Sequence, residues 1–477
     1  MRSLQDLGAA GLSSSAAEMA SKGEVGLEID VAKVPLREAR LEPYEIMVSE
    51  SQERMLCVIE PERLEELEQV CARWEVRATA IGRVTEDRRL RVLDTRSGTE
   101  GGEVVGDMPV EALVDDCPLY DLQPAKPDGQ IYPAPPRVLD SEDPQDVLPA
   151  LLSSSNLCSR RVLFEQYDCL VQSRTVRRPE QSDAAVLQLQ PERGGEGPRP
   201  GIAVSIDGNG RRVACDPYQG TVEAVLECAA NLACAGAEPL GLTNCLNFGN
   251  PEKPHVAWQL ERSVAGMAAV LTRIGVPVVG GNVSLYNESG GGPIYPTPVV
   301  GMVGRIPDVR RVPSLGFAVE GHRIALLSPP GFRPSLPGSE LAKLHGEPLP
   351  DGLPEIDVEA VAACIEAARG AARAGALASV HDVAEGGLVT ALAECCLAGG
   401  VGASVELPVG EDPLAAMFGE GVGRFVVSGP ADAIAELGEP AHAIGTVGGE
   451  ALDLGAGLRW SLSELGSAAD SLAEAFG

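Results

Sequence analysis

The stretch DVAEGGL at residues 382–388 returns in altered form as DLGAAGL at residues 6–12, an offset of 376. The same offset pairs Glu18 with Glu394, and further matches follow in the same order. These are Gly26 with Gly402, Asp30 with Glu406, Met47, Glu50 and Arg54 with Met417, Glu420 and Arg424, and AIG at 80–82 with AIG at 443–445. A shared order with small gaps predicts two copies of one supersecondary unit.

Each copy is predicted to begin with a turn rich in Asp and Gly that opens a helix. A strand, a polar loop and a strongly apolar second strand follow. The predicted elements of the first copy are a helix at 13–22, strands at 26–31 and 54–59 and a surface helix at 61–74; the apolar strand of the second copy is at 424–428. Strands interleaved with helices predict an α/β (α+β) fold of tandem duplicated units.

The second copy follows a long block at 147–316 and a strand at 322–327, whereas the first copy begins inside its opening turn. Within the block we expect a strand-and-turn segment at 203–215, helices at 221–235 and 257–275 and an apolar strand at 276–279. If the copies are equivalent, the first is truncated to its carboxyl-terminal lobe.

Five regions are therefore expected along the chain. They are the lobe of the first unit at 1–91, an extended linker at 92–146, the amino-terminal lobe of the second unit at 147–316, its carboxyl-terminal lobe at 317–455 and a tail at 456–477. The linker is predicted from its Asp-Gly, Pro-Ala-Pro-Pro and repeated acidic residues.

The chain of 477 residues carries 69 acidic and 38 basic side chains, a net charge of −31. Such a surface repels phosphate backbones and anionic membranes, so we expect neither nucleic acid nor a membrane as partner. No signal peptide is predicted at the start, and no apolar run of about 20 residues predicts a membrane span. The 12 cysteines include no Cys-x-x-Cys pair, which indicates reduced thiols and a cytoplasmic protein.

The segment GGNVS at 280–284 directly follows the apolar strand at 276–279. Glycines there let backbone N–H groups approach phosphate, Asn282 offers a carbonyl ligand to a hard cation, and Ser284 offers a hydroxyl group. The competing interpretation is a tight turn. The segment is neither a Walker loop nor a dinucleotide-binding fingerprint.

Several acidic and amide residues have two interpretations. Asp216, Asp6 and Asp382 each precede a helix and are either caps or metal ligands. The segment at 244–251, rich in Asn, is either a self-bonded turn or a ligand site.

The loop SESQ at 49–52 has polar side chains that its counterpart GEGV at 419–422 lacks, which indicates a specialised site in one copy. The five histidines show no metal-binding spacing and are expected to be structural.

Seven motifs together resemble the synthetase subunit of phosphoribosylformylglycinamidine synthase. They are QDLGAAGLSSSAAEMASKG, PYEIMVSESQERM, EQYDCLVQSRTV, CDPYQGTVEAVLECAANLACAGAEP, TNCLNFGNPEKP, VGGNVSLYNES and SVHDVAEGGL, and they occur in the order of that family. The resemblance implies tandem aminoimidazole-ribonucleotide-synthetase-like units, each with two α/β lobes.

The resemblance also implies an ATP-dependent ligase of purine biosynthesis. MgATP would activate the amide oxygen of formylglycinamide ribonucleotide as an iminophosphate. Ammonia from a separate glutaminase subunit, in a complex with a small accessory subunit, would then displace phosphate. Carried over by motif, Asp6 and Asn282 would bind magnesium, Asn244 and Gly281 would contact ATP, and Glu50, Ser51, Gln52 and Ser284 would contact the substrate.

Two departures from the family pattern qualify this expectation. Position 244 is often Asp in the family, and Asn weakens an ionic role. The leading region of the family, with its catalytic histidines, is absent, so no catalytic residue is assigned and the chain alone is expected to be inactive. The alternatives are another ATP-dependent enzyme of the same superfamily and a non-catalytic scaffold subunit that binds a glutaminase.

Overall fold

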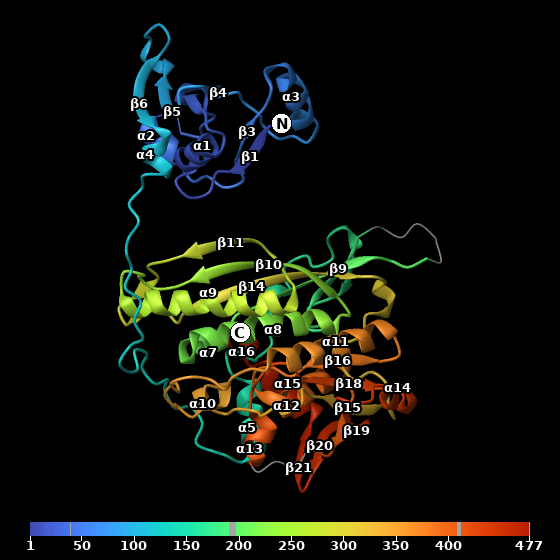
Figure 1. The fold of residues 1–477 in the computed structure, drawn as a ribbon. Coiled ribbons are helices and arrows are strands. Elements are labelled where there is room, and N and C mark those ends of the chain that lie inside the picture. The colour runs from blue at the N-terminus through green and yellow to red at the C-terminus, as the bar shows by residue number, and fades with distance from the viewer. Residues whose placement is uncertain (39, 190–196, 408–411, 477) are drawn as a thin grey trace. The chain divides into compact units, whose positions relative to one another are not determined.

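The computed structural model describes residues 1–38, 40–189, 197–407 and 412–476. The chain divides into two compact units, Met1–Asp121 (unit 1) and Leu122–Gly477 (unit 2). Figure 1 labels many of the helices and strands of both units. Within the described residues, no helix is long and apolar enough to cross a membrane.

The described residues of unit 1 form two small sheets and four α-helices. A four-stranded sheet has the order β4 (Gly82–Thr85), β2 (Gly26–Asp30), β5 (Arg89–Asp94), β6 (Glu103–Pro109), and β1 (Ser3–Asp6) pairs antiparallel with β3 (Met55–Val58). The helices are α1 (Gly11–Lys22), α2 (Pro43–Val48), α3 (Leu64–Arg73) and α4 (Val110–Val114). Leu12 and Ala16 of α1 are buried with Ile29, Ile46 and Val110, because small and apolar side chains recur on one face of this helix.

Unit 2 begins with an amino-terminal lobe built on a six-stranded sheet. Its order is β11 (Val278–Ser284), β10 (Glu238–Asn247), β14 (Thr297–Ile306), β9 (Gly201–Asp207), β8 (Ala185–Gln188), β7 (Thr175–Arg177). The lobe also contains α6 (Arg161–Phe164), α7 (Gly210–Cys215), α8 (Pro217–Cys234), α9 (Pro254–Ile274) and the short strands β12 (Glu288–Ser289) and β13 (Gly292–Pro293). Helices α8 and α9 pack side by side along the sheet (Figure 1).

The carboxyl-terminal lobe of unit 2 is built on a seven-stranded sheet. Its order is β16 (Ser379–Asp382), β18 (Phe425–Gly429), β15 (Arg323–Leu327), β19 (Ala441–Val447), β17 (Ala403–Val405), β20 (Ala451–Gly455), β21 (Leu458–Ser461). Its helices are α5 (Pro144–Leu152), α10 (Glu340–Leu344), α11 (Val358–Ala374), α12 (Gly387–Gly399), α13 (Pro413–Phe418), α14 (Ala431–Glu436), α15 (Leu462–Ala469) and α16 (Ser471–Phe476). Helix α11 packs on α8, so the two lobes share one apolar core.

The predicted repeat is present down to the strand register. Strand β1 pairs with β3 so that Asp6 lies opposite Met55, and β16 pairs with β18 so that Asp382 lies opposite Phe425. Likewise β2 and β5 are parallel in the first copy, as β17 and β20 are in the second. The α/β fold with a duplicated unit is confirmed.

Three predicted boundaries differ from the structure. The linker expected from residue 92 begins later, because β5, β6 and α4 belong to unit 1. These strands looked polar because Arg89 and Arg91 pair with Asp107 on their exposed side. Helix α5 packs into the carboxyl-terminal lobe, and the expected tail contributes the buried residues Trp460 and Leu465 to the same core.

Candidate functional site

The residues predicted in unit 1 lie together at one end of its two-stranded sheet. Asp6 ends β1, and Glu50, Ser51 and Gln52 form the loop between α2 and β3. An oxygen of the Glu50 carboxylate accepts the backbone N–H of Ala10 at 2.8 Å, which holds this loop against the turn that precedes α1. All four predicted side chains are exposed.

The same loop depends on a glycine and an arginine. Gly11 has φ +55°, and a Cβ atom there would lie 2.1 Å from the carbonyl oxygen of Ser49. The guanidinium of Arg54 donates to the carbonyl oxygens of Ser49 and, at 3.1 Å, Ser51. Glycine is therefore the residue that permits this close approach of the turn and the loop.

The residues predicted in unit 2 lie on the parallel pair β10 and β11. Asn244 is opposite Gly281 in the ladder, and Ser284 is opposite Asn247. A Cβ atom at Gly281 would lie 2.6 Å from Oδ1 of Asn244, so the amide of Asn244 occupies the space above this glycine. Asn282, which is exposed, donates from Nδ2 to the Cys245 sulfur at 3.6 Å. Its amide oxygen is the atom that fits a hard cation.

The ambiguous aspartates do not share one role. Asp216 caps α8 by accepting the N–H groups of Tyr218 and Gln219, each at 3.0 Å. Neither α1 nor α12 has a side-chain cap, so Asp6 and Asp382 do not act as helix caps. Asp382 is buried, whereas Asp6 is exposed.

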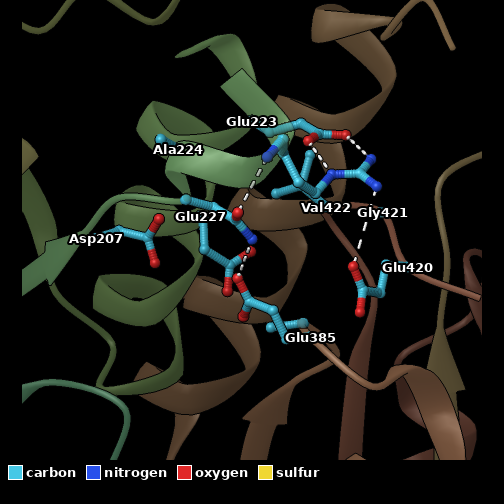
Figure 2. Close-up of a pocket in the computed structure, with 11 residues that line it drawn as sticks. Asp207, Glu223, Ala224, Glu227, Glu385, Glu420, Gly421 and Val422 are labelled. Carbon is cyan, nitrogen blue, oxygen red and sulfur yellow. Dashed lines mark hydrogen bonds and ion pairs between the residues drawn. The ribbon is translucent and has the colours of Figure 1, made fainter. Parts of the chain in front are cut away.

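A pocket lined by carboxylates lies between the two lobes of unit 2 (Figure 2). The pocket is lined by carboxylates from both lobes: Asp207, Glu223, Glu227, Glu385 and Glu420. Arg212 donates two hydrogen bonds to Glu223 at 2.6 and 2.5 Å and lies 3.9 Å from an oxygen of Glu420. Carboxylate oxygens of this kind suit Mg²⁺, although Arg212 already neutralises part of their charge.

Glu420 in this pocket is the counterpart of Glu50. An oxygen of its carboxylate accepts the backbone N–H of Gly386 at 2.9 Å, which reproduces the bond from Ala10 to Glu50, and also that of Glu340 at 2.8 Å. The repeat therefore preserves a carboxylate that fastens the turn before the helix. In the second copy the amino-terminal lobe covers this carboxylate and Asp382.

Burial raises the pKa values of the carboxyl groups in and beside the pocket. Burial and the nearby Glu385 raise the pKa of Glu420 to about 8, and burial raises the pKa of Asp382 to about 6. Burial and neighbouring carboxylates also raise the pKa values of Asp207 and Glu227. Uncharged carboxyl groups are favoured because burial removes water from them and because the pocket holds more acidic groups than cations.

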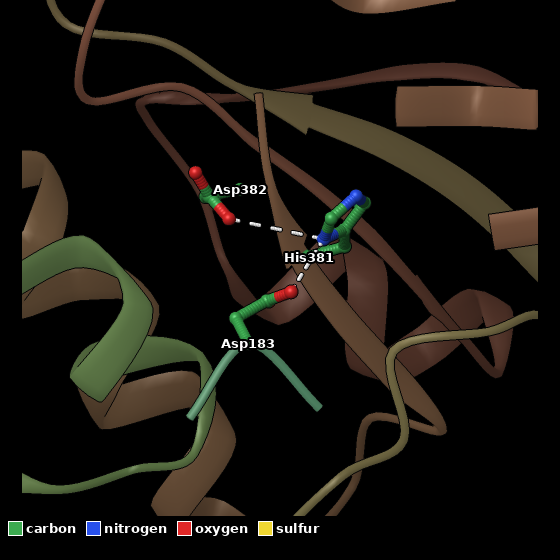
Figure 3. Close-up of side chains that lie close together, drawn as sticks. All are labelled: Asp183, His381 and Asp382. Atoms are coloured by element: carbon green, nitrogen blue, oxygen red, sulfur yellow. Dashed lines mark hydrogen bonds and ion pairs between the residues drawn. The ribbon is translucent and has the colours of Figure 1, made fainter. Parts of the chain in front are cut away.

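Asp183, His381 and Asp382 form a second group at the lobe boundary (Figure 3). Nδ1 of His381 lies 2.8 Å from Asp183 and 3.8 Å from Asp382, while Nε2 lies 3.2 Å from Glu394. Burial lowers the pKa of His381, but the Asp183 and Glu394 carboxylates raise it by more, which favours the charged form of the ring. A charged ring has no lone pair for a metal, and this group is best described as a buried ion pair.

The sequence did not reveal the carboxylate pocket. Its residues come from β9, α7, α8 and two distant loops, and only the match of Glu420 to Glu50 gave a signal. His381 was expected to be structural, and its position in the repeat is taken by Gln5. The amide of Gln5 donates to Glu18 at 2.9 Å, as His381 contacts Glu394.

Comparisons with known proteins agree with this architecture. The model of the AIR synthase related protein, N-terminal domain, matches residues 181–306, and that of the C-terminal domain matches residues 1–95 and 320–454. The C-terminal domain model thus matches both copies of the repeat.

Curated relatives and solved structures are more specific. The chain is 43% identical over 464 residues to the phosphoribosylformylglycinamidine synthase subunit PurL of Moorella thermoacetica, covering 94% of this chain and 61% of that protein. It is 44% identical over 483 residues to the PurL subunit of Thermomicrobium roseum, covering 97% of this chain and 63% of that protein. T. maritima PurL complexed with FGAR aligns with a TM-score of 0.65 at 26% identity, covering 94% of this chain and 62% of that one.

The duplicated lobes and their matching registers define a protein of the AIR synthase related class. Within that class, the chain is similar over more than nine tenths of its length to phosphoribosylformylglycinamidine synthase PurL subunits. It spans about three fifths of the length of the curated relatives it matches.

Proposed function

We propose that this chain takes part in the ATP-dependent conversion of formylglycinamide ribonucleotide and ammonia to formylglycinamidine ribonucleotide. The observation that carries the proposal is the identity of 40 to 44% to PurL subunits over more than nine tenths of the chain. Solved T. maritima PurL structures contain ATP and FGAR, which supports the same two ligands here.

The proposed reaction has two steps. The amide oxygen of the substrate attacks the γ-phosphorus of ATP, ADP leaves, and an iminophosphate forms. Ammonia then adds to the amide carbon, phosphate leaves and a proton is lost, which gives the amidine. We propose that the ammonia comes from glutamine through a glutaminase subunit, with a small accessory subunit in the complex; a solved PurLQS structure from Thermotoga maritima supports an assembly of this kind.

We propose for this chain's residues the roles that the motifs imply, and their positions in the structure support them. Glu50, Ser51 and Gln52 would position the substrate, since their loop is exposed and is fastened to the turn before α1. Asn244 and Gly281 would contact ATP, with Ser284 reaching the substrate, because the three lie on neighbouring strands. Mg²⁺ would neutralise phosphate charge, and Asp6 and Asn282 supply oxygen atoms that fit it.

Calorimetric titration of the full chain tests these roles. We expect binding of formylglycinamide ribonucleotide, and of the ATP analogue AMPPCP with MgCl₂. Gln52→Ala should weaken substrate binding by about tenfold, the loss of one or two hydrogen bonds, and leave AMPPCP binding unchanged. Gln69→Ala is the matched control, since Gln69 is an exposed glutamine on α3 of the same unit.

Two outcomes would overturn the proposal. Equal effects of Gln52→Ala and Gln69→Ala would remove the substrate role of the loop. Binding of a glutaminase without binding of substrate or nucleotide would favour a scaffold subunit instead. We also propose that turnover needs further polypeptide, since the chain covers about three fifths of its relatives, and product formation by the isolated chain would contradict that.

A further inference from the structure

Strands β10 and β11 carry a chain of side-chain hydrogen bonds on one face of the six-stranded sheet. Cys245 and Asn247 lie two residues apart on β10, so their side chains leave the same face. In the parallel ladder Cys245 is opposite Asn282, and Asn247 is opposite Ser284. The thiol of Cys245 thus lies between two amides, one of which is the candidate magnesium ligand Asn282.

The amide of Asn247 has a fixed orientation. Its Nδ2 donates to two backbone carbonyl oxygens, those of Cys245 and Thr297, each at 3.0 Å. Both protons of this NH₂ group are therefore used on carbonyl groups, which can only accept. The amide oxygen Oδ1 of Asn247 then lies on the other side of the group, 3.6 Å from the sulfur of Cys245.

The orientation of Asn247 sets the direction of the thiol. A thiol has one proton and Oδ1 of Asn247 can only accept, so Cys245 donates its proton to Asn247. The side of the sulfur that faces Asn282 then offers lone pairs alone. Cys245 can therefore accept a hydrogen bond from Asn282 but cannot donate one to it.

The thiol in turn sets the orientation of Asn282. Nδ2 of Asn282 donates to the sulfur of Cys245 at 3.6 Å. Turning this amide by half a rotation would place its oxygen against a lone pair of the sulfur, which is unfavourable because both atoms are acceptors. Oδ1 of Asn282 is therefore directed away from Cys245. Among the residues that the structure describes it has no hydrogen-bond partner, and the side chain is exposed.

We propose that Cys245 is a positioning residue, which presents the amide oxygen of Asn282 to the magnesium ion bound with ATP. The inference rests on the function proposed above, in which Asn282 binds Mg²⁺. A hard cation takes the oxygen of an amide and not its nitrogen, so an amide already held in this orientation does not have to turn before it binds. Residues that orient a metal ligand in this way commonly change metal affinity by roughly 10- to 100-fold.

Electron paramagnetic resonance of the full chain with AMPPCP tests the proposal, with Mn²⁺ as the probe of the magnesium site. We expect Cys245→Ala to weaken Mn²⁺ binding about tenfold, because Asn282 loses the acceptor that fixes its amide. Cys245→Ser keeps a proton for Asn247 and lone pairs for Asn282, so its affinity should lie within about threefold of the original chain. Cys71→Ala is the matched control, since Cys71 is a half-buried cysteine on α3 of unit 1.

A double-mutant cycle separates positioning from packing. If Cys245 acts through Asn282, Cys245→Ala should have no further effect on Mn²⁺ binding in a chain that already carries Asn282→Ala. An equal loss of affinity in both backgrounds would overturn the proposal, since Cys245 would then act by another route. Equal losses in Cys245→Ala and Cys245→Ser, with a lower urea midpoint in both, would also overturn it and assign Cys245 to packing.

The side-chain amide signal of Asn282 in a ¹⁵N-labelled chain gives a readout that needs no nucleotide. The signal, identified by its loss in Asn282→Ala, should move in Cys245→Ala and stay in place in Cys71→Ala. A signal that does not move would remove the hydrogen bond and the positioning role, and would leave the proposed function standing. A signal that moves in a chain without Mn²⁺-dependent AMPPCP binding would instead overturn the magnesium role of Asn282, and the positioning role with it.

Discussion

Gly281 of β11 lies opposite Asn244 of β10, and a substitution that adds one methyl group at Gly281 tests how closely these two residues pack. Gly281→Ala places a Cβ atom 2.6 Å from Oδ1 of Asn244, whereas the nearest atom to a Cβ at Gly280 is 3.9 Å away. We expect Gly281→Ala to lower the free energy of unfolding by about 1–3 kcal/mol through this overlap. Gly280→Ala, the matched control, should be neutral or slightly stabilising.

Urea unfolding of the two variants measures this difference. AMPPCP titration should show weaker binding for Gly281→Ala than for Gly280→Ala, because Asn244 must move. Equal stability and equal binding in the two variants would mean that the amide of Asn244 relaxes without cost.

Glu50 and Glu420 make the same backbone hydrogen bond in different surroundings. Glu420→Ala leaves the N–H groups of Gly386 and Glu340 buried without an acceptor, at a cost of about 1–3 kcal/mol each. Glu50→Ala exposes the N–H of Ala10 to water and should cost less than about 1 kcal/mol. Thermal unfolding of both variants compares them directly, and a larger loss for Glu50→Ala would contradict the assignment.

At the scale of the element, two substitutions of Asp216 distinguish a helix cap from a metal ligand. Asp216→Asn keeps an oxygen acceptor for Tyr218 and Gln219, and Asp216→Ala does not. We expect Asp216→Ala to cost about 1 kcal/mol and Asp216→Asn to cost little. Urea unfolding with and without MgCl₂ is the measurement. A loss in Asp216→Asn that appears only with MgCl₂ would indicate a metal ligand instead.

The elements that the sequence predicted well are those with a long apolar pattern or a copy elsewhere in the chain. Helix α9 and strand β18 were expected within a few residues, because their burial is one-sided or complete. Strand β6 and the end of β5 were taken for linker, because Asp107, which pairs with Arg89 and Arg91, interrupts the apolar pattern of β6. Short exposed strands carry too little pattern to separate them from loop.

At the scale of the whole molecule, the buried carboxyl groups predict a pH dependence. The pKa values of Glu420 and Asp382, about 8 and 6, exceed their ordinary values of 4.5 and 3.8. Their contribution to stability is therefore complete below about pH 4 and is lost as the pH rises through 6 and 8. His381, whose pKa is also raised, changes stability in the same direction.

We expect the melting temperature of unit 2 to fall by several degrees between pH 6 and pH 8.5. Glu420→Gln should flatten this slope, since the amide has no proton to lose. Glu464→Gln is the control, because Glu464 is exposed on α15 and bonds to Ser461. A slope unchanged by Glu420→Gln would assign the dependence to other groups.

The division into two units predicts where a protease first cleaves the chain. Leu119 and Tyr120 are 93% and 76% exposed and lie just before the boundary at Asp121. Brief treatment with chymotrypsin should cleave there first and release the two units. Leu119→Ser with Tyr120→Ser should remove the cut, and early cleavage inside either unit would contradict this boundary.

Part of the candidate site could be predicted from the sequence, and part could not. Asp6, Glu50 and Gly281 lie in short motifs, so their grouping within each unit could be predicted. The carboxylate pocket could not, because Asp207, Glu227 and Glu385 meet only after two lobes pack. Raised pKa values arise from that packing and have no signature along the chain.

The polar contacts at the lobe boundary have a consequence for cooperativity. Asp183 and His381, Asn209 and Glu385, and Arg212 and Glu420 each join one lobe of unit 2 to the other. Parting the lobes would break these contacts and expose the apolar core that α8 and α11 share. The two lobes, which match separate domain models, should therefore melt in a single calorimetric transition and leave no hinge between them.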